Sequence, residues 1–364
     1  MKINTQILKK ACQEIAQAVD TKKNTVYANA LQIEVKDGVL LLSTTNREYY
    51  VELKVEVECE DSFKTTVQAQ KFIQLMSKLT SENIELTTDG LNLVIAANGE
   101  YKIPLVYLDD KMLEIPIIEI KNKVADVKLT QEILQGIMTN TSRELKTLNG
   151  ISPVQSKNYY HITKDGAITY NLGVSYSKFE LNEDVRIALS QKVVSLFKLL
   201  KDDEVEMIVG KDFEGEEEVN KVKFITENCI ISSLAPSTKV MDLVPMTAIT
   251  KMISQNYPSV VKVNCAELIS AIDRLLVFCD SDFYCGSLNF TPLNVTISNS
   301  QKTCVENISL EEIENAMNTT VAINLKRLRT TLENSEYVEI GYGDARTVCV
   351  KTDTSVDIIP RIII

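Results

Sequence analysis

The side chains that enzymes most often use for chemistry are few or poorly spaced in this sequence. The single histidine, His161, lies in Tyr159-Tyr160-His161-Ile162-Thr163, whose residue types predict a β-strand, so a packed or surface position is favoured over a catalytic one. The acidic run Glu214-Gly215-Glu216-Glu217-Glu218 could bind a metal ion, but strand-like segments on both sides favour a solvated hairpin loop. We therefore expect no catalytic residue and no metal site.

Cysteine and glycine usage points the same way. The eight cysteines stand singly, without a CxxC pair, which favours reduced thiols in a cytoplasmic protein. No Gly-x-Gly-x-x-Gly, P-loop or nucleophile elbow is present, and 12 glycines are too few for several phosphate-binding loops. We expect no cofactor. An enzyme with an unrecognised carboxylate–metal site is a further alternative.

Length and composition predict an ordinary globular protein. The chain has 364 residues, of which 45% are hydrophobic and 24% are charged, enough for two or three domains that each bury a core. No apolar run approaches the roughly 18 residues that cross a bilayer. Residues 1–20 predict an amphipathic helix with charges throughout, and not a signal peptide. A cytoplasmic location follows.

A weak internal repeat is the strongest pattern in the sequence. A short strand followed by an amphipathic helix opens three segments, in which Leu8, Leu134 and Leu268 are equivalent. A second helix follows each opening after a β-like segment, with Lys71, Lys192 and Lys326 as equivalent positions. A strand comes directly after each second helix, at 83–86, 205–208 and 338–340. Two independent landmarks recur at nearly the same period, so the chain contains three copies of one module.

Each copy is predicted to hold two helices and about eight strands. The first helix shows 3.6-residue apolar spacing, and the segments between the helices alternate as strands do, with hairpin turns at Asp37-Gly38, Asp89-Gly90 and Asp165-Gly166. The fold class is α+β, with antiparallel sheets covered by helices on one side. We expect modules at 1–122, 123–248 and 249–364. Three tandem domains without any special arrangement remain the alternative.

Charge is unevenly distributed along the chain. The six repeated helices, taken as 5–19, 68–79, 130–145, 190–201, 264–278 and 324–333, carry a net charge of +6, whereas the whole chain carries −11. If these helices face one channel, that channel attracts DNA phosphates without regard to sequence, and the acidic remainder repels DNA. The alternative is that lysine simply suits exposed helix positions.

Three copies, cationic helices and an acidic remainder together resemble the β sliding clamp of bacterial DNA polymerase III. The best local matches are Met1-Lys2-Ile3, Thr66-Val67-Gln68-Ala69-Gln70-Lys71-Phe72 and Ile358-Ile359-Pro360-Arg361-Ile362. The resemblance implies a non-enzymatic processivity factor for DNA replication, a head-to-tail homodimer whose helices line a ring around duplex DNA. It also implies a DNA polymerase and a clamp loader as partners. A clamp-fold interaction scaffold that does not encircle DNA is the competing hypothesis.

The helices, and two loops that the family uses to contact DNA, supply the expected DNA-binding residues. These are Lys9, Lys10, Lys22, Lys23, Lys71, Lys78, Arg143, Lys146, Lys192, Lys198, Lys201, Arg274, Lys326, Arg327 and Arg329.

The resemblance implies two further surfaces. The dimer interface falls on Tyr101 and Ile103 of one copy and on Val277 and Phe278 of the other, although all four could be ordinary core residues. Partner proteins of the family insert a short peptide with apolar anchors into a groove. The matching positions are Gly173, Val174, Tyr176, Leu243, Val244, Val348, Ile358, Ile359, Pro360, Arg361, Ile362 and Ile363. The last six of these could instead form only a closing strand.

The groove positions depart from the family pattern. Asn171-Leu172-Gly173-Val174-Ser175 stands where the family often has threonine, aspartate, glycine, histidine and arginine. The departure is typical of a divergent chromosomal clamp or of one carried by a mobile element or virus.

Overall fold

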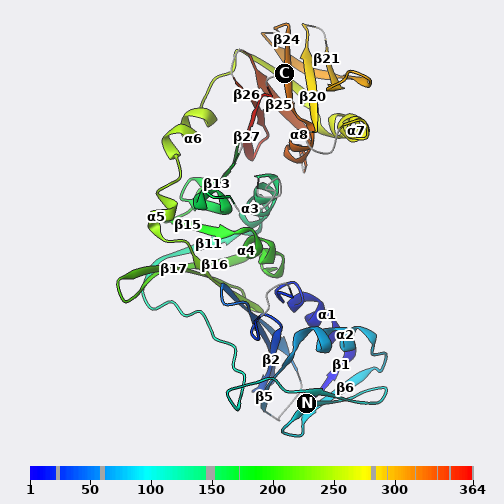
Figure 1. Cartoon of the computed structure of the whole chain (residues 1–364), viewed down its shortest axis with the longest axis vertical. Coiled ribbons are helices and arrows are strands. Elements are labelled where there is room, and N and C mark those ends of the chain that lie inside the picture. Colours follow the sequence, from blue (N-terminus) through cyan, green and yellow to red (C-terminus); the bar gives the residue numbers. More distant parts are fainter. Residues whose placement is uncertain are drawn as a thin grey trace. The chain divides into compact units, whose positions relative to one another are not determined.

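The computed structural model describes residues 1–364 except 22–24, 58–61, 145–151, 172, 280–283, 293, 316, 334, 344–345 and 363–364. Two compact units form: residues 1–131 with 195–237, and residues 132–194 with 238–364. In the described part of the chain, no helix is long and apolar enough to cross a membrane. Figure 1 follows the elements from the N-terminus in blue to the C-terminus in red.

One order of elements occurs three times. The first copy consists of β1 (Lys2–Asn4), α1 (Thr5–Ile15), β2 (Ala30–Lys36), β3 (Val39–Thr45), β4 (Tyr49–Glu56), β5 (Phe63–Gln68), α2 (Ala69–Lys78), β6 (Asn83–Thr88), β7 (Asn92–Ala96) and β8 (Glu100–Pro104). The second consists of β11 (Lys123–Thr130), α3 (Gln131–Glu144), η2 (Gln155–Asn158), β12 (Tyr159–Thr163), β13 (Gly166–Tyr170), β14 (Val174–Lys178), β15 (Arg186–Ser190), α4 (Gln191–Ser195), η3 (Leu196–Leu199), β16 (Glu204–Glu214), β17 (Glu217–Ile225) and β18 (Cys229–Ala235).

The third copy has one strand more. It consists of β19 (Ser259–Asn264), α7 (Cys265–Leu276), β20 (Cys285–Phe290), β21 (Val295–Asn299), β22 (Val305–Ile308), β23 (Leu310–Glu314), β24 (Thr319–Asn324), α8 (Leu325–Thr331), β25 (Tyr337–Tyr342), β26 (Thr347–Lys351) and β27 (Ser355–Pro360). Between copies lie β9 (Tyr107–Leu108) with β10 (Lys111–Met112), and α5 (Thr238–Met241) with α6 (Met246–Ile253).

Strand pairing repeats along with the element order. The strands after each first helix pair as β4-β3-β2-β5, β14-β13-β12-β15 and β22-β21-β20-β24. The strands after each second helix pair as β1-β6-β7-β8, β11-β16-β17-β18 and β19-β25-β26-β27. All these pairs are antiparallel. The predicted α+β class and the three-fold repeat are therefore confirmed, with about eight strands per copy as expected.

Copies join through their sheets. In the first unit, β18 pairs with β4, so the strands of two copies form one eight-stranded sheet. In the second unit, β27 pairs with β14 to give a nine-stranded sheet, which β23 extends at one end. β8 and β22 are terminal strands of their four-stranded sheets.

Local sequence explains where the helices begin. Asn4, Asn264 and Asn324 stand directly before α1, α7 and α8, and the side-chain oxygen of each accepts a hydrogen bond from a backbone N–H of the first turn. The predicted helix 190–201 is shorter: α4 ends at Ser195 and continues as the 3₁₀ turn η3. The Asp37-Gly38 hairpin forms as predicted, with φ of 51° and 76° at its two residues.

The paired helices of a copy pack together and cover its sheets. α1 contacts α2, and α7 contacts α8 (Figure 1). Leu268, Ile272 and Leu275 of α7 are buried against the strands of the third copy. In the same core, the rings of Phe290 and Tyr342 stack with their centroids 3.8 Å apart. The apolar stripes predicted for the helices are the faces that these cores bury.

Candidate functional site

Exposed apolar side chains gather near the terminal strand β22. Val277 and Phe278, directly after α7, are 79% and 56% exposed, and Val305 of β22 is 57% exposed. Large apolar side chains with so much exposed surface favour burial by a partner. Sequence reasoning singled out Val277 and Phe278 but missed Val305, because the short β22 has no clear alternating pattern.

The other expected dimer residues lie on β8 in the first unit. Tyr101 is half-buried and Ile103 is buried. Beside them is a hollow of about 720 Å³ with a mixed apolar and polar lining. Its lining residues are Thr21, Thr25, Val26, Asn29, Gln68, Lys71, Ile103, Pro104, Leu105, Val106 and Tyr107. The structure thus places a cavity next to a terminal strand.

The predicted DNA-binding cations differ in accessibility. Lys10, Lys71, Lys78, Lys198 and Lys326 are exposed, while Lys9 and Lys192 are half-buried. The Lys326 ammonium lies 4.7 Å from the centre of the Tyr284 ring. These lysines are the part of the set that a phosphate backbone could reach most easily.

Three predicted cations are already paired with carboxylates. Lys201 bonds Glu14, Arg274 contacts Glu306 at 2.7 Å, and Arg329 contacts Asp273 at 2.6 Å. The hydrogen bonds from Arg274 lower the pKa of Glu306 below its ordinary value. Since each pair is close to neutral, these residues attract phosphate less than the sequence count implies.

Arg327 is buried inside the chain. It is 5% exposed, and its Nη2 lies 3.4 Å from the carbonyl oxygen of Ile358. Burial lowers the pKa of the guanidinium to about 10, and the nearby Asp357 carboxylate partly offsets this shift. In this structure Arg327 cannot contact DNA, so it is left out of the DNA-binding surface proposed below.

Some expected residues lie outside the described part of the structure. These are Lys22, Lys23, Lys146 and Ile363, together with the side chain of Arg143.

Several expected groove residues do meet in one apolar cluster of the second unit. Val174, Val244 and Ile358 are buried together with Tyr170 and Ile249, and Tyr176 packs against them. Leu243 is 58% exposed, whereas Gly173, Pro360, Arg361 and Ile362 are partly exposed. Val348 and Ile359 instead belong to the separate core of the third copy. The structure therefore divides the predicted groove residues between two clusters.

Sequence reasoning missed one wall of this cluster. Met246, Ile249, Met252 and Ile253 lie on α6, which spans the module boundary expected between residues 248 and 249. Apolar residues three and four positions apart could have indicated a short helix there.

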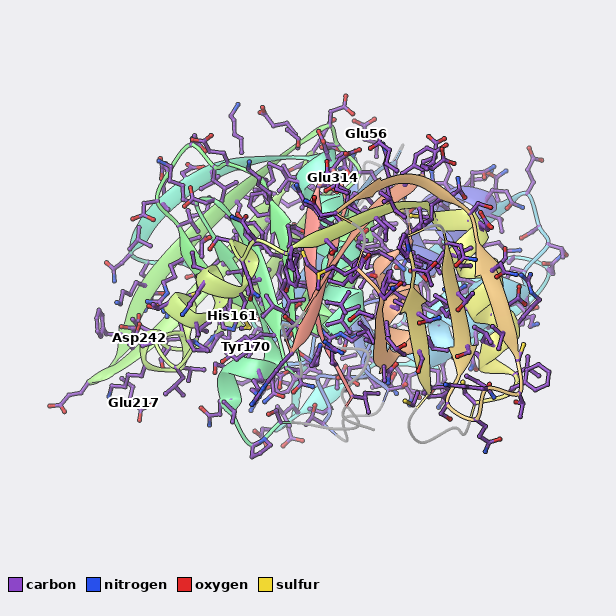
Figure 2. All side chains as sticks on the ribbon, turned by 90° about the horizontal axis from the view of Figure 1, so that it is seen from above. Glu56, His161, Tyr170, Glu217, Asp242 and Glu314 are labelled. Atoms are coloured by element: carbon purple, nitrogen blue, oxygen red, sulfur yellow. The ribbon has the colours of Figure 1, made fainter. Side chains whose placement is uncertain are left out.

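His161 is packed in the interior of the protein, and the acidic run at 214–218 lies at a hairpin. His161 is buried, its Nε2 lies 2.7 Å from the carbonyl oxygen of Ser156, and it sits near Tyr170 (Figure 2). Burial lowers the pKa of His161, which favours a neutral ring. Glu217 lies at the end of the β16–β17 hairpin, directly after the turn at Gly215 (Figure 2). Among the described residues, no group of three or more His, Cys, Asp or Glu side chains could hold a metal ion.

Comparison with known proteins agrees with this architecture. The sequence model described as the N-terminal domain of the DNA polymerase III beta subunit matches residues 1–119. The chain is 26% identical over 230 residues to the beta sliding clamp of Rickettsia felis and 27% identical over 232 residues to that of Rickettsia bellii. Both alignments cover 60% of this chain and 58% of the relative.

The similarity in fold, unlike the similarity in sequence, covers the whole chain. The crystal structure of the DNA polymerase III subunit beta from Pseudomonas aeruginosa superimposes with a TM-score of 0.81, at 16% identity, over 100% of both chains. At such identity this match shows the fold alone. Residues 1–119 thus match the N-terminal domain of the DNA polymerase III beta subunit, and the chain as a whole has the fold of solved DNA polymerase III beta subunits.

Proposed function

We propose that this protein is a DNA sliding clamp, a processivity factor in which two copies close head to tail into a ring around duplex DNA. The ring tethers a DNA polymerase and other DNA-processing proteins in the cytoplasm and does no chemistry of its own. Each copy contributes modules 1–122, 123–248 and 249–364, with the helices facing the DNA.

The strand pairing between modules carries this proposal. β18 ends the second module and pairs with β4 of the first, and β27 ends the third module and pairs with β14 of the second. By the same rule, β8, which ends the first module, should pair with a strand equivalent to β4 and β14. That strand is β22. Because β8 and β22 are different surfaces, a second copy that supplies both partners gives a head-to-tail ring.

The equivalent residues support this junction. Ala18 and Phe278 each lie ten residues after the equivalent leucines Leu8 and Leu268. Ala18 is fully buried, and its carbonyl accepts a 2.7 Å hydrogen bond from Tyr49 of the junction strand β4. Phe278 holds the same place but is 56% exposed. We expect the hollow beside β8 of the second copy to receive Phe278.

The distribution of charge supports the proposal that the ring encloses DNA. Lys10, Lys71, Lys78, Lys198 and Lys326 are exposed lysines on the repeated helices and η3 of a chain whose net charge is −11. Contacts with phosphate are independent of sequence, so one contact can replace another as the ring moves along the duplex. Processivity then comes from enclosure and does not require tight binding.

Leu243, which is 58% exposed, and the partly buried Tyr176 and Met246 at the edge of the apolar cluster suit a short peptide with apolar anchors. We propose this edge as the docking site for the polymerase and for a clamp loader. Few anchors give modest affinity, so partners can exchange on one clamp.

Retention on DNA tests the proposal against a scaffold that never encloses it. The chain is loaded onto a nicked circular plasmid by a clamp loader, and half of the sample is linearised. A ring should stay on the circle and leave the linear DNA through its ends. Equal retention on both forms would contradict enclosure.

A further inference from the structure

The strand pair that joins the second and third modules has two chemically different faces. Val174 and Tyr176 of β14, with Val356 and Ile358 of β27, face the apolar cluster proposed to bind peptides. The residues between them point to the opposite face, because successive side chains of a strand alternate. One pair of strands therefore lines the apolar cluster on one side and a second environment on the other.

That second environment is polar and sealed from water. Ser175 and Asp357 stand directly opposite each other in the two strands, and both are fully buried. The Ser175 hydroxyl donates a hydrogen bond to Asp357, and the Ser355 hydroxyl lies 3.5 Å from the other carboxylate oxygen. A buried carboxylate needs a compensating charge as well as hydrogen bonds.

Arg327 of α8 brings a buried positive charge near this carboxylate, and the two opposite charges attract each other. The Asn324 side chain accepts a 2.9 Å hydrogen bond from the backbone N–H of Arg327. This cap at the start of α8 fixes the position of the Arg327 backbone, and so the point from which its guanidinium extends. Its Nη2 reaches the Ile358 carbonyl, and it also approaches Gly173 closely: a Cβ atom on Gly173 would lie 2.3 Å from Nη2 and 2.1 Å from the Ile358 oxygen. The guanidinium thus contacts the backbone on both sides of the strand pair.

A buried ion pair seldom stabilises a protein more than well-packed apolar residues of the same size, but it restricts geometry, since each charge must keep its partner. We infer that Arg327 is a positioning residue of the proposed peptide groove: it holds Gly173 and the Ile358 carbonyl, so that Val174 and Ile358 stay packed in the apolar cluster and Tyr176 keeps its place against them. This inference rests on the proposed function of the groove.

The test uses the full-length chain and four variants: Arg327→Leu, Asp357→Leu, the double variant and Arg329→Leu. Arg329 is the matched control, because it lies on the same helix but pairs with Asp273 at the surface. Three quantities are measured: the unfolding temperature, the amide hydrogen exchange of residues 173–177, and the affinity for a fluorescein-labelled short peptide with apolar anchor residues.

Each single variant at the ion pair should lower the unfolding temperature, because it leaves one buried charge without compensation. The double variant should recover that temperature. It should nevertheless keep exchange about tenfold faster at residues 173–177 and bind the peptide about tenfold more weakly than the wild type, because no group then holds the backbone of Gly173 and Ile358. Arg329→Leu should change neither exchange nor affinity.

Two results would overturn the inference. One is a double variant that recovers exchange and affinity together with stability, which would reduce the ion pair to a packing role. The other is a double variant as unstable as the single ones. If the wild type does not bind the peptide, the groove proposal fails. The exchange measurement still decides whether Arg327 positions the strands, since it needs no ligand.

Discussion

The side-chain amide of Asn299 donates a 3.3 Å hydrogen bond to the backbone carbonyl of Phe278, 21 residues away. Asn299 is fully buried at the end of β21; its amide also donates to Thr303 at 2.7 Å, and its oxygen accepts a bond from the Cys304 N–H. One asparagine therefore ties the residues after α7 to the turn that leads into β22. Both segments belong to the proposed dimer edge.

Replacing Asn299 with alanine should weaken dimerisation. The variant lacks the side chain that connects the Phe278 carbonyl to the turn before β22. The dimer edge is then less ordered in the monomer, and ordering it on association costs binding free energy. We expect the dimer dissociation constant, measured by sedimentation equilibrium, to rise about tenfold or more. Asn294→Ala, at an exposed turn of the same sheet, is the control and should leave it unchanged.

Phe278→Asp should give monomers in sedimentation velocity. The substitution places a charge where the proposed contact buries an aromatic ring, and an unpaired buried charge is strongly unfavourable. Phe213→Asp is a matched control, since Phe213 is also an exposed phenylalanine, 60% against 56%, on β16. A dimer that survives Phe278→Asp, or that dissociates equally with Phe213→Asp, would contradict the proposed interface.

Neutralising exposed lysines should reduce the salt dependence of DNA binding. Each phosphate contact contributes a slope of about 0.9 to the logarithmic plot of affinity against salt concentration. Lys78→Ala and Lys198→Ala should each lower that slope, measured by fluorescence anisotropy with duplex DNA, by up to about 0.9. Arg274→Ala should change it less, because Glu306 already pairs with that arginine. Equal effects at all three positions would show that the ion pair does not matter.

Low pH should weaken the hydrogen bonds that hold the segment connecting the first two modules, and so lower the stability of the protein. The Asp212 carboxylate accepts hydrogen bonds from the Lys221 ammonium at 2.8 Å and from the backbone N–H groups of Asn122 and Lys121. These donors lower the pKa of Asp212 to about 2, with Lys221 having the largest effect. Because the folded pKa lies below the value of about 3.9 in an unfolded chain, the stabilisation is present above pH 4 and is lost as pH falls towards 2.

Urea unfolding between pH 2 and 6 measures this loss. Asp212→Asn should be less stable than the wild type at pH 6, and the difference should shrink towards pH 2. Asp89→Asn is a comparison within one turn: hydrogen bonds from Leu91 and Asn92 also lower the pKa of Asp89 to about 2, so its stability difference should shrink over the same pH range. A difference for Asp212→Asn that stays constant with pH would contradict this account.

Two glycines should respond in opposite ways to alanine. A Cβ on Gly173 would lie 2.1 Å from the Ile358 oxygen, so Gly173→Ala must displace β27 or the loop before β14 and should cost about 1–3 kcal/mol of unfolding free energy. Gly136 lies inside α3, and a Cβ there would meet nothing within 4 Å. Gly136→Ala should therefore stabilise the protein by up to about 1 kcal/mol. Chemical denaturation of both variants measures the contrast.

Features that depend on residues close together in the chain could be predicted from the sequence. The apolar spacing of α1 and α7, the Asp37-Gly38 hairpin and the strand after each second helix follow from near neighbours, and their threefold recurrence gave the architecture. α6 shows a limit of this reasoning, since a short helix between two modules looked like a boundary.

Pairing and burial were decided by tertiary structure. On α8, Lys326, Arg327 and Arg329 have similar sequence surroundings, yet one lies on an aromatic ring, one is buried and one pairs with acids. Their environments come from residues far away in the chain: Asp273 for Arg329, and Asp357, itself bonded to Ser175 at a separation of 182 residues, for Arg327. The charge of a cation is set by its residue type, but whether that charge faces solvent depends on long-range contacts that helix and strand periodicity do not encode.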